Sequence, residues 1–158
     1  MVGTKGEWRV AITADRALQL LTRVMDPEIP GLSIVDLGMV DSIKVDESGV
    51  HVDLIPTFMG CPALDLIRQR VQDALGDAPA VVRFVHTKPW TTQMVSAQGR
   101  AALTQWGIAP PTDSPAGVRC PLCGSPNTRR TSAFGSGLCR ASFYCHDCAQ
   151  PFEQMKSI

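Results

Sequence analysis

The sequence predicts an α+β protein in two parts: an α-β-β-α-β-α domain with a three-stranded mixed sheet, and a small C-terminal domain held together by cysteine ligands. Helical and strand-like apolar patterns alternate between residues 14 and 106. A proline-rich segment follows. Five of the six cysteines come after that segment, four of them in C-x-x-C pairs.

The first predicted element is a helix over residues 14–25. Thr13 can cap it, and apolar residues recur at steps of three and four: Ala17, Leu18, Leu21, Val24 and Met25. Residues 26–31 contain two prolines, which remove backbone donors and disfavour helical conformation before them. We expect the helix to end there and a rigid loop to follow.

The central segment predicts a hairpin and a crossover. Residues 39–45 and 50–55 are rich in strand formers, and a polar connection at 46–49 separates them. A helix follows Pro62 and ends at Gly76, with one apolar face made by Leu64, Ile67, Val71 and Leu75. The next strand covers residues 80–86, so a parallel pairing through the intervening helix is expected. A last helix is predicted over residues 97–106.

Residues 109–117 contain three prolines and little apolar bulk, which predicts a stiff linker. We place the domains at 1–112 and 113–158. The second domain has few large apolar side chains, too few to stabilise a core without a bound metal or another cross-link.

Four cysteines could bind a metal ion that stabilises this part: Cys120, Cys123, Cys145 and Cys148. Two C-x-x-C pairs are separated by 21 residues, and each pair can turn both thiolates toward one point, so that two pairs complete a tetrahedron. The spacing predicts a zinc ribbon with one structural Zn. An iron site and a redox dithiol are the alternatives.

Composition and motifs argue against several functions. Fifteen basic and fifteen acidic residues cancel, which weighs against nucleic-acid binding. Neither a membrane span nor a signal peptide is recognisable, so we expect a cytoplasmic protein with no membrane partner. A nucleophile–base pair, a phosphate loop and a cofactor fingerprint are all missing, which predicts a protein that is not an enzyme.

Four further residues are candidates for chemistry. Cys61 is predicted at or next to a helix N-cap, where the dipole would favour a thiolate, although capping or packing explains it equally well. Cys139 has no partner at C-x-x-C spacing; it is a buried apolar residue, a reactive thiol or a replacement ligand. Asp26 and Glu28 lie on the proline-stiffened loop, where metal coordination, proton transfer, helix capping and simple solvation are all open.

Longer motifs carry a resemblance. The segments DPEIPGLSIVDLGMV at 26–40 and TFMGCP at 57–62 resemble the iron–sulfur assembly domain shared by SufT-like proteins and the eukaryotic cytosolic iron–sulfur targeting factors. The tail, with CPLCG at 120–124, Cys139, CHDC at 145–148 and Pro151-Phe152, resembles the D components of bacterial phenylacetyl-CoA epoxidase systems. Together the two resemblances cover nearly the whole chain.

The resemblance implies a non-catalytic accessory protein that assists iron–sulfur cluster or metal-centre maturation. Its partners would be the di-iron oxygenase and the reductase of the epoxidase system. Cys61, Asp26, Glu28 and Cys139 fall on the positions expected to handle a transient iron–sulfur cluster. One thiolate cannot complete cluster ligation, so a homodimer or a ligand from the client is implied. The alternatives are a zinc-ribbon scaffold that only docks the oxygenase complex, and a thiol redox protein that uses Cys61.

Overall fold

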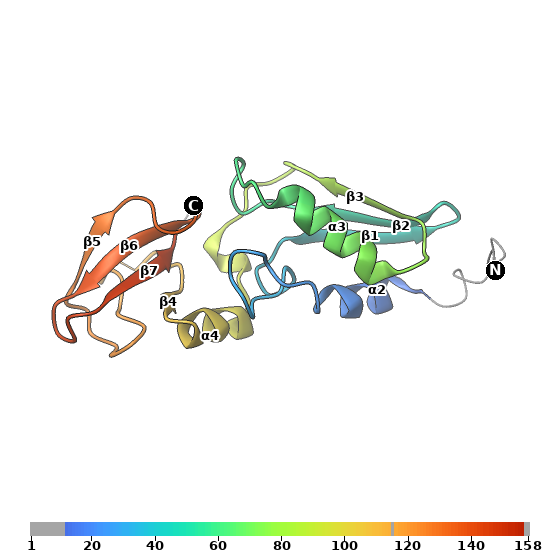
Figure 1. The fold of residues 1–158 in the computed structure, drawn as a ribbon. Coiled ribbons are helices and arrows are strands. Elements are labelled where there is room, and N and C mark those ends of the chain that lie inside the picture. Colours follow the sequence, from blue (N-terminus) through green and yellow to red (C-terminus); the bar gives the residue numbers. More distant parts are fainter. Residues whose placement is uncertain (1–11, 115, 157–158) are drawn as a thin grey trace.

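The computed structural model describes residues 12–114 and 116–156, which form two sheets lying next to each other (Figure 1). The first part follows the predicted order, with a short 3-10 helix added before the last helix: α2 (Ala14–Leu21), β1 (Val40–Asp46), β2 (Gly49–Leu54), α3 (Leu64–Leu75), β3 (Ala80–Phe84), η1 (Thr92–Met94) and α4 (Ala97–Gln105). Within these described ranges, no helix has the length and apolar character needed to cross a membrane.

The first sheet is mixed, as predicted, with the order β1-β2-β3. Strands β1 and β2 pair antiparallel, with Val45 opposite Val50. Strand β3 pairs parallel to β2, with Val82 opposite Val52. This is possible because α3 returns the chain to the end of the sheet at which β2 begins. Helices α2 and α3 pack on the sheet and on each other (Figure 1).

The core of this domain lies between the helices and the sheet. Alternate residues of β2 are buried, as expected for a strand with one face covered: Val50, Val52 and Leu54. Helix α3 buries the apolar face predicted from its spacing, made by Ile67, Val71 and Leu75. Each such side chain contributes about 1.5–3 kcal/mol when fully buried.

Helix α2 is shorter than predicted, and ends at Leu21 instead of Met25. Thr13 caps it as expected, since its Oγ1 accepts from the Arg16 amide at 3.1 Å. After Leu21 the chain turns, with the Val24 amide donating to the Leu21 carbonyl at 3.0 Å. The helical spacing of apolar residues extends beyond Leu21 in the sequence, because Val24 is also buried, although it lies in a turn and not in the helix.

The second sheet has the order β4-β7-β6-β5. Its strands are β4 (Ile108–Ala109), β5 (Thr128–Ser132), β6 (Arg140–Cys145) and β7 (Pro151–Met155). The apolar interior is small. Phe143 stacks on Phe152 with ring centroids 5.6 Å apart, and Ala141, Cys120 and Cys145 are buried beside them. Such a core fits the expectation that the tail needs a metal staple.

The first residues of the predicted linker are packed, so that prediction is wrong for residues 109–111. Ala109 is buried and pairs with Gln154 of β7. The Pro111 carbonyl accepts from the Arg100 guanidinium at 2.8 Å. Proline lacks an amide proton but keeps its carbonyl, and here distant side chains use that carbonyl. Met155 of β7 joins the core of the first domain, so the two parts share a packed boundary. The domain limit at 112/113 remains a prediction.

Candidate metal centre and thiol–carboxylate site

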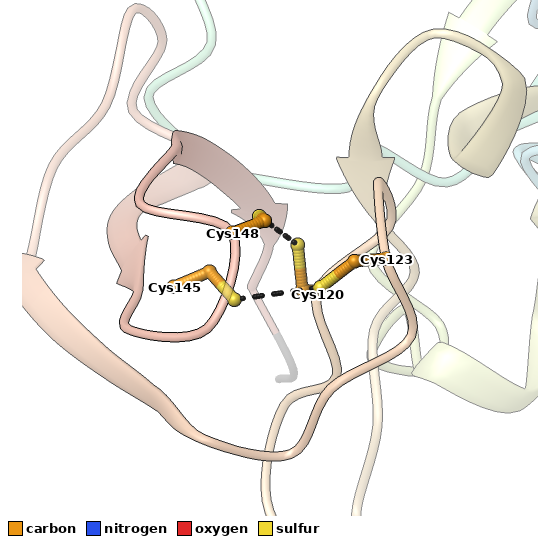
Figure 2. Close-up of side chains that lie close together, drawn as sticks. All are labelled: Cys120, Cys123, Cys145 and Cys148. Atoms are coloured by element: carbon orange, nitrogen blue, oxygen red, sulfur yellow. Dashed lines mark hydrogen bonds between the residues drawn. The ribbon is translucent and has the colours of Figure 1, made fainter.

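Cys120, Cys123, Cys145 and Cys148, here called the ribbon site, converge from two turns of the second sheet (Figure 2). All four sulfur atoms lie within 4.8 Å of one another. Sγ of Cys120 is 3.7 Å from Sγ of Cys148, and Sγ of Cys123 is 3.6 Å from Sγ of Cys145. Four thiolates at about 2.3 Å from a tetrahedral zinc lie about 3.8 Å apart. The four cysteines are therefore positioned to bind one metal ion with tetrahedral sulfur ligation.

Local turns hold the ribbon site together. Gly124 adopts φ +77°, a left-handed conformation, and its amide donates to the Cys120 carbonyl at 2.8 Å. In the second turn the Cys145 amide donates to the Gln150 carbonyl at 3.0 Å. Asp147 links the two turns, because its carboxylate accepts from Ser125 Oγ and from Asn127 Nδ2. The sequence-predicted ligand set is thus brought together with supporting contacts around it.

The thiols of the ribbon site would ionise unequally in the absence of metal. Backbone amides of Cys148 and Asp147 donate to the Cys145 sulfur and lower the pKa of that thiol to about 7. Burial, together with hydrogen bonds to the other three sulfurs, raises the pKa of Cys148 to about 12. Metal binding must therefore displace protons, which makes the affinity for metal increase with pH.

Asp26 and Glu28 lie on a rigid loop after α2. One carboxylate oxygen of Asp26 accepts from the amides of Glu28 and Ile29, at 2.8 and 2.9 Å. Ile29 and Leu32 are each 1% exposed and anchor the loop in the core. Burial raises the pKa of Asp26 despite the two amide donors that lower it. The loop therefore holds its carboxylates in fixed positions.

Cys61 lies on the loop between β2 and α3 and is partly buried. The prediction that it occupies or adjoins the N-cap is wrong, since Ala63 takes that position and Cys61 lies two residues earlier. Burial raises the pKa of the Cys61 thiol; the Ala63 amide offsets part of this rise, and the charges of Glu28 and Asp26 add to it. The expected thiolate is not favoured, because burial and the neighbouring negative charges both disfavour ionisation, and the helix dipole acts only over the first turn.

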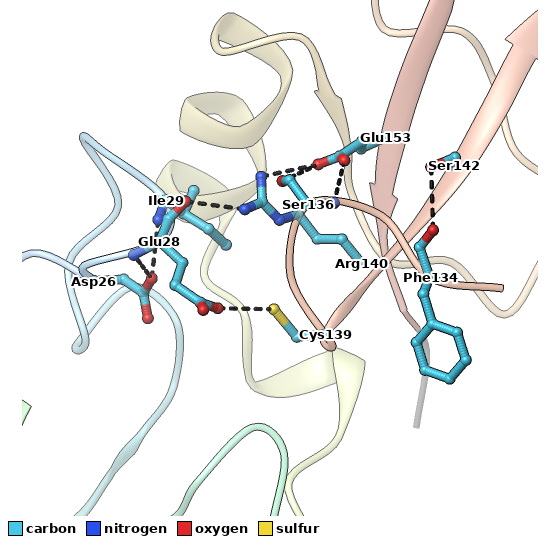
Figure 3. Close-up of polar contacts among 9 residues, drawn as sticks. All are labelled: Asp26, Glu28, Ile29, Phe134, Ser136, Cys139, Arg140, Ser142 and Glu153. Carbon is cyan, nitrogen blue, oxygen red and sulfur yellow. Dashed lines mark hydrogen bonds and ion pairs between the residues drawn. The ribbon is translucent and has the colours of Figure 1, made fainter. Parts of the chain in front are cut away.

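Cys139 comes from the connection between β5 and β6, at the tip of the second sheet. Its Sγ lies 3.7 Å from Oε2 of Glu28 and donates a hydrogen bond to it (Figure 3). Burial, followed by the charges of Glu28, Asp26 and Cys61, raises the pKa of Cys139 to about 11. The second sheet thus brings its unpaired cysteine against Glu28 of the first domain, and the charges of Asp26 and Cys61 also act on this thiol. We call Asp26, Glu28, Cys61 and Cys139 the interface site.

Arg140 connects the two domains next to this site and was not identified from the sequence. Its guanidinium pairs with Glu153 Oε2 at 2.9 Å and donates to the Glu28 carbonyl at 3.2 Å (Figure 3). The side chain is only 11% exposed. Gly137 allows the close approach, since a Cβ there would lie 3.0 Å from Oε2 of Glu28. The contacts with Glu28 join residues more than 100 positions apart, so no local pattern could have indicated them.

The ligand atoms of the interface site lie farther apart than those of the ribbon site. Across residues 12–114 and 116–156, only the ribbon cysteines bring three or more ligand atoms within 4.8 Å of one another. The interface site offers two sulfurs and two carboxylates with wider spacing, and its thiols are protonated near neutral pH. Such a set is not a closed metal cage. It can bind a thiophilic metal species only with proton loss and with room for a further ligand.

Comparison with known families divides the chain as the structure does. Residues 14–84 match a family described as an iron–sulfur cluster assembly protein. Residues 109–156 match a family described as the PaaD zinc beta ribbon domain. The solved structure of a domain of unknown function from Bacillus anthracis superposes with a TM-score of 0.53 at 28% identity, and covers 57% of this chain and 90% of that chain.

Relatives of two lengths are found. A Bacillus subtilis protein named Fe-S protein maturation auxiliary factor YitW is 40% identical over 88 residues, 52% of this chain and 85% of its own length. The Staphylococcus aureus auxiliary factor SufT is 40% identical over 51% of this chain and 96% of its own length. A protein of Escherichia coli K12, provisionally named as the D component of 1,2-phenylacetyl-CoA epoxidase, is 36% identical over 88% of this chain and 90% of its own length. With both domains and their order matched, the chain belongs to the family of phenylacetyl-CoA epoxidase D components, which joins an iron–sulfur cluster assembly domain to a zinc beta ribbon.

Proposed function

We propose that this protein is a non-catalytic accessory factor of a phenylacetyl-CoA epoxidase system, and that it assists iron–sulfur cluster or metal-centre maturation of the oxygenase or reductase component. One observation supports this most: the Cys139 thiol of the ribbon donates to the Glu28 carboxylate, and the charges of Asp26 and Cys61 act on the same thiol. These are thiol and carboxylate donors for iron, gathered where two domains meet. Iron, alone or in a cluster, would be the cargo.

The ionisation of the interface site suits transient binding. Both thiols have raised pKa values, so they are protonated when the site is empty. Cargo must displace these protons to bind, and the protons compete for the sulfurs again when a client offers better ligands. A site of this kind holds metal less firmly than four preformed thiolates would. That property is useful in a carrier and harmful in a storage site.

We also propose that the ribbon site holds one structural zinc. The four sulfurs lie within 4.8 Å of one another, and a zinc bound by all four would have no open position for substrate. The zinc would stabilise the small second sheet and, through it, the placement of Cys139. The six free cysteines fit a reducing compartment, and we place the protein in the cytoplasm.

Two alternatives remain for the same site. A zinc-ribbon scaffold would dock the oxygenase complex without any use of Cys61. A thiol redox protein would need a thiolate at neutral pH, and the raised pKa of Cys61 weighs against it. Maturation explains the thiols and the carboxylates together, so we favour it.

The test is maturation of a client in vitro. Apo-reductase and apo-oxygenase are incubated with a cluster or iron donor and either the wild-type chain or Cys61→Ser, and client metal content and phenylacetyl-CoA turnover are followed. We expect the variant to fold and bind its clients but to deliver less metal. Met59→Leu, on the same exposed loop, is the matched control. Full client loading by Cys61→Ser would reject the proposed mechanism and favour a scaffold.

A further inference from the structure

We infer that a cavity at the carboxyl ends of β2 and β3 binds a small carboxylic acid with an aromatic body, and that Lys156 of the ribbon binds the carboxylate of this ligand. None of the residues that line the cavity belongs to the ribbon site or the interface site. The proposed function assigns no small-molecule ligand to the chain. The cavity is therefore a further binding site, which can be tested separately from the handling of iron.

The position of the cavity is typical of a ligand site. Strands β2 and β3 pair parallel, with Leu54 opposite Phe84, and both end on the side of the sheet nearest the ribbon (Figure 1). The chain then leaves β2 toward α3 and leaves β3 toward η1, so the two loops diverge. In open sheets, ligands bind beyond the carboxyl ends of parallel strands at such a place. The cavity here has a volume of about 600 Å³. Small-molecule sites usually measure about 300–1,000 Å³.

Apolar side chains form most of the walls: Ile55, Pro56, Phe58, Met59, Pro89 and Trp90. Trp90 is only 3% exposed, and its Nε1 donates to the Leu37 carbonyl at 2.8 Å, so this ring is held in place. Phe58 adds a second aromatic side chain, and Met59, which is 69% exposed, adds an adaptable thioether next to solvent. Such walls favour a flat apolar body, because aromatic groups bury a large area and pack on one another.

The polar part of the lining is neutral or basic. Beside Thr57 it consists of His86, Lys88 and Lys156, and no aspartate or glutamate of the described residues lines the cavity. Lys88 pairs with Asp41 at 2.7 Å, which offsets its charge. A cationic ligand would find no carboxylate in this lining, whereas an anionic ligand would find a basic partner. The cavity therefore favours an apolar acid.

Lys156 has the least compensated charge in the lining. Its ammonium donates to the Leu138 carbonyl at 2.8 Å and lies 4.0 Å from the centre of the Phe134 ring, and both of these partners are neutral. Within residues 12–114 and 116–156, no carboxylate forms an ion pair with it. An ammonium has three donors, so a ligand carboxylate can bind Lys156 without displacing either contact. A charge-assisted hydrogen bond of this kind is roughly twice as strong as a neutral one.

Naphthylacetate and naphthylacetamide are the probes, because they share an aromatic body and differ in charge. The full chain, with zinc retained in the ribbon, is titrated with each by calorimetry. We expect saturable binding of one naphthylacetate per chain. Naphthylacetamide should bind about tenfold more weakly, since it cannot form the charge-assisted hydrogen bond. Acetate, which lacks the apolar body, should not bind at the same concentrations.

Lys156→Met tests the proposed carboxylate partner. The affinity for naphthylacetate should fall about tenfold, while the affinity for naphthylacetamide should stay unchanged. A purely structural effect of the substitution would weaken both ligands alike. Lys44→Met is the matched control, because Lys44 is exposed on β1 and does not line the cavity. This control should change neither affinity.

The methionine methyl groups locate the bound ligand. In nuclear magnetic resonance spectra of the wild-type chain, naphthylacetate should shift the methyl signal of Met59, because an aromatic ring would lie next to it. Met25 is 38% exposed but lies outside the lining, so its signal should not move. This measurement needs no substitution, and it remains decisive if Lys156→Met fails to fold.

Four results would overturn the inference: no saturable binding of naphthylacetate, equal affinities of the wild-type chain for the acid and the amide, equal losses of both affinities in Lys156→Met, or a shift of the Met25 signal without one of Met59. The first, second and fourth are measured on the wild-type chain alone.

Discussion

The Cys139 thiol donates a hydrogen bond to the Glu28 carboxylate across 3.7 Å, although 111 positions separate the two residues in the sequence. The contact joins the tip of the zinc ribbon to the acidic loop of the assembly domain (Figure 3). A buried thiol beside a carboxylate keeps its proton, because both burial and the negative charge disfavour the thiolate. The ionisation of Cys139 is therefore a direct reporter of how the two domains are joined.

Glu28→Gln should make Cys139 more acidic. The substitution keeps the shape of the side chain and removes the charge that is the second cause of the raised pKa. We expect a lower pKa for Cys139 and faster alkylation at a fixed pH in zinc-loaded protein. Mass spectrometry of the modified peptides measures it. Asp77→Asn, at an exposed position away from the site, is the control and should change nothing.

Alkylation of the two interface thiols, Cys61 and Cys139, should be slow at neutral pH and should become faster as the pH rises. With a pKa of about 11, Cys139 reacts slowly at pH 7, and its rate should rise about tenfold per pH unit toward that value. Cys61 should also react more slowly than an unperturbed thiol, since burial raises its pKa. A rate for Cys61 above that of a model thiol at pH 7 would contradict the description of its surroundings.

The raised pKa of Cys139 also predicts a loss of stability in alkaline solution. The folded value of about 11 lies above the ordinary 9.0, so folding favours the protonated thiol. The contribution is fully present below pH 9 and is lost as pH rises through 11. The difference in unfolding free energy between the wild-type chain and Cys139→Ser should therefore shrink over this range. Denaturant titrations at several pH values measure it, and a constant difference would argue against a buried thiol.

Removal of zinc should release the ribbon while the assembly domain stays folded. The second sheet has a small apolar core, whereas the first has its own. The assembly domain should still lose some stability, about 1.5–3 kcal/mol, because Met155 of β7 packs into it. Elemental analysis should find one zinc per chain beforehand, and thermal unfolding with and without chelator tests the rest. Loss of both domains in one transition would contradict it.

Much of the fold could be predicted because its signals are local. The spacing of Ile67, Val71 and Leu75 and the stop at Gly76 defined α3, and the ribbon ligands followed from C-x-x-C spacing. Errors arose where local signals were ambiguous. The turn at Pro62-Ala63 moved Cys61 away from the helix, and the carbonyls of Pro110 and Pro111 found partners far along the chain.

The sequence identified each residue of the interface site but could not predict that they belong to one site. Asp26, Glu28, Cys61 and Cys139 were each identified as a candidate, yet their meeting depends on how one domain docks on another. That docking is fixed by Arg140 and Gly137, which have no motif of their own. An arginine in a strand and a glycine in a loop are common in any sequence. Only their tertiary contacts distinguish these two.

Arg140→Met is the variant that tests this docking most directly. Methionine keeps the apolar stem and removes the guanidinium that binds Glu153 and the Glu28 carbonyl. Hydrogen bonds to charged groups contribute about 1.5–3 kcal/mol each. Glu153 is 25% exposed and keeps its bonds to Ser136, so solvent and these bonds offset part of the loss. We expect a net destabilisation of about 2 kcal/mol.

The more specific consequence concerns Cys139. Without the bridge, the ribbon tip should separate from the acidic loop more often, and Cys139 should become open to alkylation at a pH where the wild-type thiol is protected. Arg129→Met, on the exposed face of β5, removes the same chemical group without touching the interface and should leave Cys139 protected. Zinc content should stay at one per chain in both variants, because neither arginine contacts the ribbon cysteines through its side chain. Equal protection of Cys139 in the two variants would mean that Met155 and the β4–β7 pairing hold the domains together without Arg140.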